Sequence, residues 1–241
     1  MTNPTRPAPG DIARDHLAIA LDVPSLGEAV ELARSVAPWF GVAKVGLELY
    51  SAAGPAMVEP LADLGLRVFC DLKLHDIPTT VGRAARVLGR LGVAYLNFHA
   101  AGGVAMLRAG VDGVKEGARD AGRGAPVPLA VTVLTSDPDA SAFDARLAYA
   151  IEAGCGGVVC SVQEIARVKR ARKDFVAVVP GVRLGGGDVH DQARVGTPAQ
   201  VAAAGADVLV VGRAVSAATD RTAAARLVHE SVTGALGSVR V

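Results

Sequence analysis

Short apolar runs and longer segments with helical spacing alternate along the whole chain. The apolar runs are rich in Val, Leu and Ile, whereas the segments between them are rich in Ala, Arg and Glu. This pattern predicts eight strands, at 16–23, 42–48, 66–73, 93–99, 128–135, 156–161, 175–180 and 206–211. It predicts eight helices, at 25–37, 54–64, 79–91, 102–119, 141–153, 162–172, 197–204 and 221–234.

Strands that are apolar throughout are typical of a parallel sheet covered on both faces. Eight strand-helix units in 241 residues match the size of a closed (β/α)8 barrel, or TIM barrel. An open, doubly wound sheet is the alternative. The G-x-G-x-x-G turn that a dinucleotide-binding sheet needs does not follow the first predicted strand. We therefore expect an α/β protein with a single (β/α)8 barrel domain.

The first ten residues, MTNPTRPAPG, are polar and rich in proline, with no apolar segment behind their charges. They are not typical of a signal peptide. We expect a flexible tail over residues 1–14 and a barrel over residues 15–241, because no linker or shift in composition divides the rest of the chain.

Charge and cysteine content narrow the classes of partner. With 25 basic and 24 acidic residues, the net charge of +1 argues against non-specific binding to nucleic acid or to a membrane surface. The longest uncharged run, 91–107, is too short and too polar to span a bilayer. Three cysteines, Cys70, Cys155 and Cys160, lack metal-ligand spacing and suit a reducing cytoplasm.

Charged residues lie in or just after three consecutive predicted strands. Asp22 is near the end of the first, Lys44 lies in the second, and Asp71 and Lys73 end the third, with Asp76 three residues later. In a barrel, side chains at the C-terminal ends of the strands point into the mouth where chemistry takes place. A single Lys–Asp pair at the strand ends is as readily explained by two charges that solvate each other. Four charges on three consecutive strands favour a functional site.

Strand periodicity orients two of these charges. Asp71 and Lys73 share one face of their strand, and this face must point into the barrel if Cys70 and Leu72 are to meet the helices. The chain has 5 Lys and 20 Arg, yet two of its lysines lie in predicted strands. Unlike arginine, lysine can release its proton at accessible cost, as a general acid must.

A second group of residues lies near the C-terminus. Gly212 and Arg213 follow the eighth strand, where barrels usually bind phosphate. A Gly-Arg dipeptide alone is more often a turn with a solvated arginine. The segment between the seventh strand and the next helix has five glycines and the length of a lid, with Arg183 and Gln192 as candidate ligand contacts. His99 is a candidate base, though more typical of a core residue, and His75 is a candidate supporting residue.

The run DLKLHDIPTT, residues 71–80, resembles the D-x-K-x-x-D-I-P-x-T motif of the orotidine 5′-phosphate decarboxylase family. Six further segments are similar to the bacterial branch of this family and occur in the same order over residues 16–220. They are ALDVP at 20–24, KVGLELY from Lys44, TVLTS, PGVR, DQARVGTP and VVGR. The resemblance implies a homodimeric barrel that decarboxylates orotidine 5′-phosphate to UMP without metal or cofactor.

The resemblance also implies roles for matching positions. Lys73 corresponds to the proton donor to pyrimidine C6, and Asp71 to a residue beside the departing carboxylate. Lys44 corresponds to a residue that holds Asp71 and contacts the ribose side, and Asp22 to one that binds a ribose hydroxyl.

Other matching positions complete the implied site. Asp76 and Thr80 match residues that reach the neighbouring subunit's site, and Ile77 is a further substrate-binding position of the same motif. Thr135 is expected near the pyrimidine. Gln192 is expected to bridge base and phosphate from the lid, and the phosphate cradle is expected to consist of Arg183, Gly212 and Arg213.

Two other functions stay open at this stage. A sugar-phosphate decarboxylase or aldolase of the same barrel type shares the D-x-K-x-x-D motif but uses Mg²⁺ and has an acidic residue where this chain has Lys44, a cation that repels a metal ion. A non-catalytic phosphate-binding barrel needs the cradle but not the paired lysines and aspartates.

Overall fold

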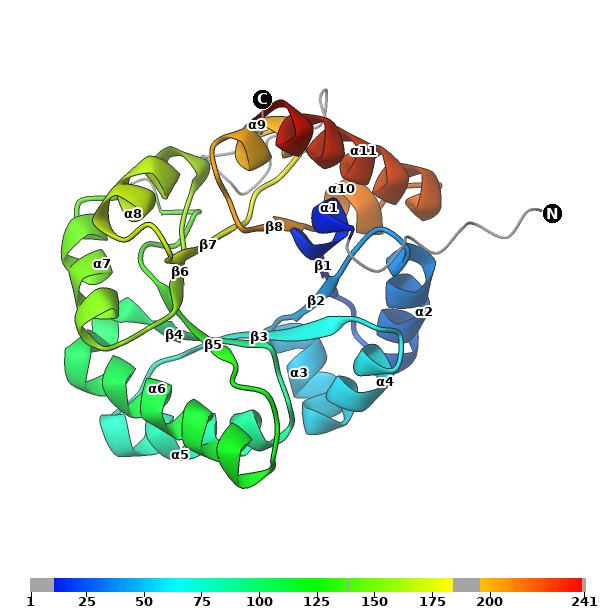
Figure 1. The fold of residues 1–241 in the computed structure, drawn as a ribbon. Helices are drawn as coiled ribbons and strands as arrows, with labels where there is room; N and C mark the ends of the chain where they lie inside the picture. Colours follow the sequence, from blue (N-terminus) through cyan, green and yellow to red (C-terminus); the bar gives the residue numbers. More distant parts are fainter. Residues whose placement is uncertain (1–10, 138, 184–195, 240–241) are drawn as a thin grey trace.

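The computed structural model describes residues 11–137, 139–183 and 196–239. Its strands form a closed parallel barrel in which each strand pairs with the next and β8 pairs with β1. The strands are β1 (Leu17–Ala20), β2 (Val42–Val45), β3 (Arg67–Leu74), β4 (Tyr95–His99), β5 (Val127–Val131), β6 (Gly157–Val159), β7 (Val176–Val179) and β8 (Val208–Val211). Helices surround this barrel (Figure 1). The predicted (β/α)8 fold is confirmed.

Helix α1 (Ile12–Asp15) precedes β1, and the other helices lie between successive strands or after β8. They are α2 (Leu26–Val36), α3 (Leu47–Ala53), α4 (Val58–Ala62), α5 (Pro78–Arg90), α6 (Gly103–Asp120), α7 (Phe143–Glu152), α8 (Ile165–Ala171), α9 (Pro198–Ala203), α10 (Arg213–Ser216) and α11 (Arg221–Val239). Short 3-10 turns are η1 (Gly54–Met57), η2 (Ala100–Gly102) and η3 (Val162–Glu164). Side-chain caps stabilise several helix N-termini. At the start of α2, for example, the Ser25 side chain accepts a hydrogen bond from the Glu28 amide.

Several predicted strands are too long: those at 16–23, 128–135 and 156–161 end at Ala20, Val131 and Val159, and the one at 42–48 also runs into a helix. The sequence predicts a strand over 42–48, but β2 ends at Val45 and α3 begins at Leu47, after Gly46. The apolar run continues across this boundary, so hydrophobicity alone does not mark it. In α3 only Leu49 is buried, which is the one-sided burial of a helix and not that of a covered strand.

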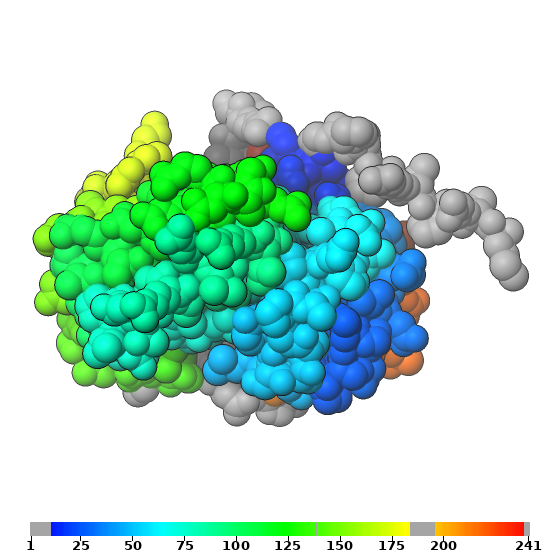
Figure 2. Space-filling view, turned by 90° about the horizontal axis from the view of Figure 1, so that it is seen from below, coloured from blue at the N-terminus to red at the C-terminus, as the bar shows by residue number. Residues whose placement is uncertain are grey.

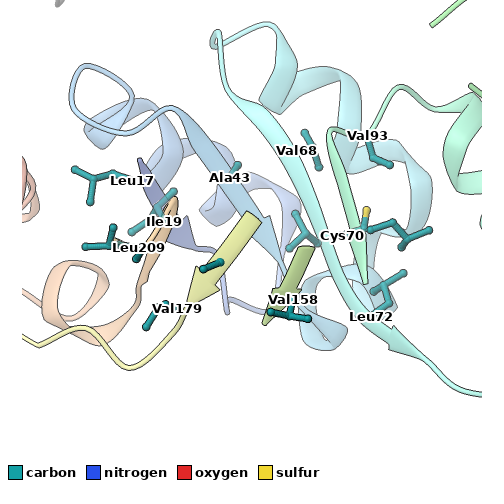
Figure 3. Packing of buried hydrophobic residues seen from close by; sticks show 14 of the residues in the cluster. Leu17, Ile19, Ala43, Val68, Cys70, Leu72, Val93, Val158, Val179 and Leu209 are labelled. Carbon is teal, nitrogen blue, oxygen red and sulfur yellow. The ribbon is translucent and has the colours of Figure 1, made fainter. Parts of the chain in front are cut away.

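Two apolar layers hold the barrel together. Side chains such as Ala18, Val42 and Phe69 fill the inside, whereas a larger set packs between strands and helices. On β3, Cys70 and Leu72 belong to the outer layer (Figure 3). The predicted alternation of this strand is confirmed, and its odd-numbered residues therefore face the interior or the mouth.

Residues 11–14 of the segment expected to be a tail take part in folded structure. Asp11 caps α1 by accepting a hydrogen bond from the Arg14 amide, and its Oδ2 lies 2.8 Å from His229 Nε2 of α11. Residues 1–10 lie outside the described part of the chain. Among the described residues, no helix combines the length and hydropathy needed to cross a bilayer.

Helices α5 and α6 pack unusually closely behind β3 and β4. A Cβ atom at Gly113 would lie 2.2 Å from the Gly82 carbonyl oxygen, and one at Gly117 would lie 2.0 Å from that of Arg86. Glycine is therefore required at both positions of α6. Figure 2 shows this flank, with α5 and α6 side by side over the barrel. The packing fixes α5, which directly follows the 71–77 segment.

Candidate active site

The charged residues of the first three strands meet in a cavity of about 270 Å³ at the C-terminal end of the barrel. Polar residues predicted to form the site line this cavity from both sides: Asp22, Lys44, Asp71, Lys73, Thr135, Arg183, Gly212 and Arg213. The structure thus brings together residues separated by almost 200 positions in the sequence. Side chains from β1–β3 form one wall, and segments following β7 and β8 form the other.

The first wall is a chain of alternating charges. Lys44 Nζ lies 2.9 Å from Asp22 Oδ1 and 3.5 Å from Asp71 Oδ2. Lys73 Nζ donates to Asp71 Oδ1 at 2.7 Å. Each interior charge therefore has an opposite charge on at least one side, which offsets the cost of burying it. Lys44 is almost fully buried, whereas the Lys73 side chain is 34% exposed and reaches the cavity.

Asp71 is ionised at neutral pH. Burial acts to raise the pKa of its carboxyl, but the charges of Lys44 and Lys73 and hydrogen bonds from Lys73 and Asn97 outweigh burial and hold the pKa below its usual value. The carboxylate therefore provides a fixed negative charge beside the Lys73 ammonium.

Lys73 also has an unusual backbone. Its φ is +50°, and no other non-glycine residue of the described chain has a positive φ. A side chain in this left-handed region costs roughly 1–2 kcal/mol, so the surroundings must hold it there. The pairing of β3 with β4 is irregular between Cys70 and Leu74, which places this strain at the end of β3 where Lys73 enters the cavity.

Asn97 is a residue of this region that the sequence reasoning missed. Its side chain is fully buried, and it contacts both the Lys73 backbone and the Asp71 carboxylate. The available signal was an amide in the middle of an otherwise apolar strand, YLNFH. Buried polar side chains need partners, and this requirement is itself a pointer to neighbouring polar groups.

The second wall presents cations and open backbone. Within the described residues, the Nε of Arg183 is buried and has no hydrogen-bond partner. Gly212 is open on its side-chain face, because among the described residues a Cβ there would approach only Ala20, at 3.7 Å. Arg213 follows as the first residue of α10. Two guanidinium groups beside accessible backbone fit an anionic group such as phosphate.

Three predicted site residues do not line this cavity. Asp76, Ile77 and Thr80 are all exposed, and Asp76 Oδ1 accepts a hydrogen bond from the Ile77 amide at 2.6 Å. Gln192 lies outside the described residues. Within this chain, Asp71 and Lys73 at the start of the DLKLHDIPTT motif thus line the cavity, whereas its later residues Asp76, Ile77 and Thr80 do not.

The two histidines near the motif pack on each other. The rings of His75 and His99 are stacked with centroids 5.3 Å apart, and neither residue lines the cavity. Burial and the nearby charges of His75, Arg146 and Lys73 lower the pKa of His99, and its Nδ1 accepts a hydrogen bond from the Ala101 amide. This placement fits supporting residues and does not favour His99 as a base.

Comparison with known proteins agrees with this geometry. The chain is 49% identical to an orotidine 5′-phosphate decarboxylase of Moorella thermoacetica, over 91% of this chain and 93% of the relative. It is 50% identical to one of Anaeromyxobacter dehalogenans, over 89% and 96%. A crystal structure of the enzyme from Lactobacillus acidophilus superposes with a TM-score of 0.76 at 31% identity, over 90% of this chain and 98% of that one. Residues 15–228 match the Orotidine 5′-phosphate decarboxylase / HUMPS family, and the chain belongs to that family.

Proposed function

We propose that this protein decarboxylates orotidine 5′-phosphate to UMP, a step of pyrimidine biosynthesis, without a metal or cofactor. The observation that carries the proposal is the Asp71–Lys73 pair, which holds an ammonium in the same cavity that two arginines line. The family and the names of the relatives support the same reaction.

Lys73 is the proposed proton donor. When the bond between C6 and the carboxylate breaks, CO₂ leaves and the electron pair stays on C6, where the pyrimidine ring delocalises it poorly. A preorganised ammonium stabilises the developing negative charge and then transfers a proton to C6. Asp71 keeps the ammonium in place through the 2.7 Å contact. Lys73 regains its proton from solvent after UMP forms.

The remaining cavity residues are proposed to bind substrate. Asp22, Lys44 and Thr135 line the cavity. The first two are proposed to contact the ribose side of the substrate, and Thr135 to approach the pyrimidine. The cradle of Arg183, Gly212 and Arg213 is proposed to hold the phosphate, with Gln192 contributing from its segment. Binding energy from the remote phosphate is then available to position the ring against Lys73.

We further propose a homodimer in which Asp76, Ile77 and Thr80 complete the partner's site. All three are exposed and lie away from their own chain's cavity. Ile77 is 65% exposed, and so is Leu47, which follows β2, at 61%. Large apolar side chains that are left exposed are typical of a surface that another molecule covers.

A mixed dimer tests the shared site. Lys73→Ala and Asp76→Ala homodimers each carry two damaged sites, but a dimer of one chain of each kind has one site with both groups intact. Random exchange of equal amounts should restore roughly a quarter of wild-type activity. Each variant refolded alone is the control. Demonstrated subunit exchange without returning activity would show that Asp76 acts in its own barrel.

The sugar-phosphate alternative is less compatible with the cavity. The carboxylates of Asp22 and Asp71 are bridged by Lys44, so a cation already occupies the space between these oxygen ligands. The part of the chain that the structure describes also holds no group of three or more His, Cys, Asp or Glu side chains arranged for a metal. The side chains of this cavity therefore favour a reaction in which a lysine, and not a metal ion, supplies the positive charge.

The direct test follows ultraviolet absorbance of orotidine 5′-phosphate in the presence of EDTA. Conversion to UMP is the expected result. An unchanged spectrum with folded protein would reject the proposed function, and turnover of a sugar phosphate only after Mg²⁺ is added would favour the alternative.

We also propose a cytoplasmic location. Cys70, Cys155 and Cys160 are free thiols buried in the barrel, and burial raises the pKa of Cys70 and Cys155 to about 12. Buried cysteines that form no disulfide are compatible with a reducing compartment.

A further inference from the structure

Asn97 occupies the point where β3 departs from regular pairing. Cys70 pairs with Leu96, and the next pair is Leu74 with Phe98, so four steps along β3 match two along β4. The extra residues contain Asp71 and Lys73. Asn97 lies on β4 between the two pairs, with its side chain fully buried.

Both ends of the Asn97 amide are used. Oδ1 accepts a hydrogen bond from the Lys73 backbone amide at 2.7 Å, and Nδ2 donates to Asp71 Oδ1 at 2.6 Å. The two contacts define the orientation of the amide, because a backbone N–H must face the oxygen and a carboxylate must face the NH₂ group. One side chain thus links the strained backbone of Lys73 to the carboxylate that binds its ammonium.

We propose that Asn97 is a positioning residue for the reaction: it holds the left-handed turn at Lys73 and the orientation of Asp71, and so aims the Lys73 ammonium at the reacting carbon. This inference rests on the proposed decarboxylation. Asn97 does not line the cavity, and it acts through its two neighbours.

The contact geometry explains why another side chain would not serve. The Oδ1 atom of Asp71 receives hydrogen bonds from both Asn97 and Lys73, and its Oδ2 faces Lys44. An apolar residue at position 97 would leave the Lys73 amide without this acceptor, and the positive φ would lose its restraint. An aspartate would keep the acceptor but place a second carboxylate against Asp71.

Two variants of similar size separate these contacts. Asn97→Leu removes both hydrogen bonds, and we expect kcat to fall by at least about 30-fold while the affinity for UMP changes less than about threefold, because only the reacting groups are misplaced. Asn97→Asp retains the acceptor for the Lys73 amide. Thr132→Val is the matched control, because Thr132 is equally buried and donates to the Val159 carbonyl without contacting Asp71 or Lys73.

The pH dependence gives a readout that a purely structural role would not move. The charges acting on Asp71 are Lys44 from β2 and Lys73 from β3, with Asp22 next to Lys44; His99 from β4 is near Lys73. A second carboxylate disfavours ionisation of Asp71. For Asn97→Asp we therefore expect the acid limb of kcat/KM to move up by at least about one pH unit. The profile of Thr132→Val should match the wild type.

A measurement without turnover keeps the inference separate from the proposed reaction. The carboxyl carbon of Asp71 can be followed against pH by NMR, assigned with Asp71→Asn, and its titration should shift upward in both Asn97 variants. If wild-type protein leaves orotidine 5′-phosphate unchanged, the proposed function fails, and this titration still decides whether Asn97 positions Asp71. An unmoved titration overturns the inference. So does a kcat loss no larger than that of Thr132→Val, or a loss of folding in both Asn97 variants while Thr132→Val folds.

Discussion

The charges of the first wall of the barrel mouth and the Arg183 guanidinium of the second wall differ in how they are partnered. On the β1–β3 wall, lysines and aspartates are paired with one another before any ligand arrives, at distances of 2.7–3.5 Å. On the β7–β8 wall, Arg183 has a buried Nε with no partner among the described residues. Paired charges are held in fixed positions, whereas a buried donor without a partner is available to an incoming anion. We therefore assign the chemical step to the first wall and phosphate binding to the second.

The largest effect is expected from Lys73→Ala. Turnover should be abolished, because the ammonium is needed as charge develops on C6 and the other wall cannot supply it. The measured kcat should be less than about 1% of the wild-type value, which corresponds to a loss of about 3 kcal/mol or more of transition-state stabilisation. Lys169→Ala is the matched control: Lys169 also pairs with a carboxylate at 2.6 Å, that of Asp207, but away from the cavity. If Lys73→Ala retained more than about 1% of the wild-type kcat, Lys73 would not be the proton donor.

Arg213→Ala tests the second wall. Arg213 is exposed in this structure, and a bound phosphate would bury it in a charge pair. We therefore expect kcat/KM for orotidine 5′-phosphate to fall by a factor equivalent to roughly 2–5 kcal/mol, the cost of removing one partner of such a pair. The reaction of orotidine without the phosphate should scarcely change. Arg221→Ala, which removes an exposed guanidinium bound to the Ser216 carbonyl, is the control. Equal losses on both substrates would show that Arg213 supports the fold.

Asp71→Asn tests how strongly the first wall is coupled. Two lysines lose their shared carboxylate, and we expect the free energy of unfolding to fall by about 3 kcal/mol at neutral pH, as when a buried pair is broken. Since the folded-state pKa of Asp71 lies below its unfolded value of about 3.9, the carboxylate stabilises the protein above that pH. This advantage is lost as the pH falls through the folded-state pKa.

Urea unfolding of wild type and Asp71→Asn at matched protein concentration measures this difference. The two curves should approach each other only in the acid range below about pH 4. A difference that grows toward acid pH would contradict the sign of the pKa shift.

The smallest effect is expected from Asp22→Asn. Asp22 pairs with the same Lys44 but is 56% exposed, so solvent screens the interaction. Loss of unfolding free energy should stay within about 1 kcal/mol in the same urea experiment. A loss as large as that of Asp71→Asn would mean that the outer pair contributes as much as the buried one, and the graded description of this wall would be wrong.

The sequence predicted the barrel because eight apolar runs and the helices between them obey local periodicities. The inward direction of Asp71 and Lys73 followed from the same period of two, and their place in the cavity agrees with it. The start of α3 was not predictable from an apolar run that continues through it. Asn97 was missed because its importance depends on the irregular register between β3 and β4, which belongs to two strands and not to either sequence segment.

UMP binding to Lys73→Ala and Arg213→Ala, measured side by side by calorimetry, tests the division between the two walls most directly. UMP carries the phosphate and ribose but not the departing carboxylate, so it reports binding without the reaction. We expect a Kd within about threefold of wild type for Lys73→Ala and at least about 30-fold weaker binding for Arg213→Ala. Equal weakening in both variants, or the reverse order, would contradict the separation of the chemical step from phosphate binding in this cavity.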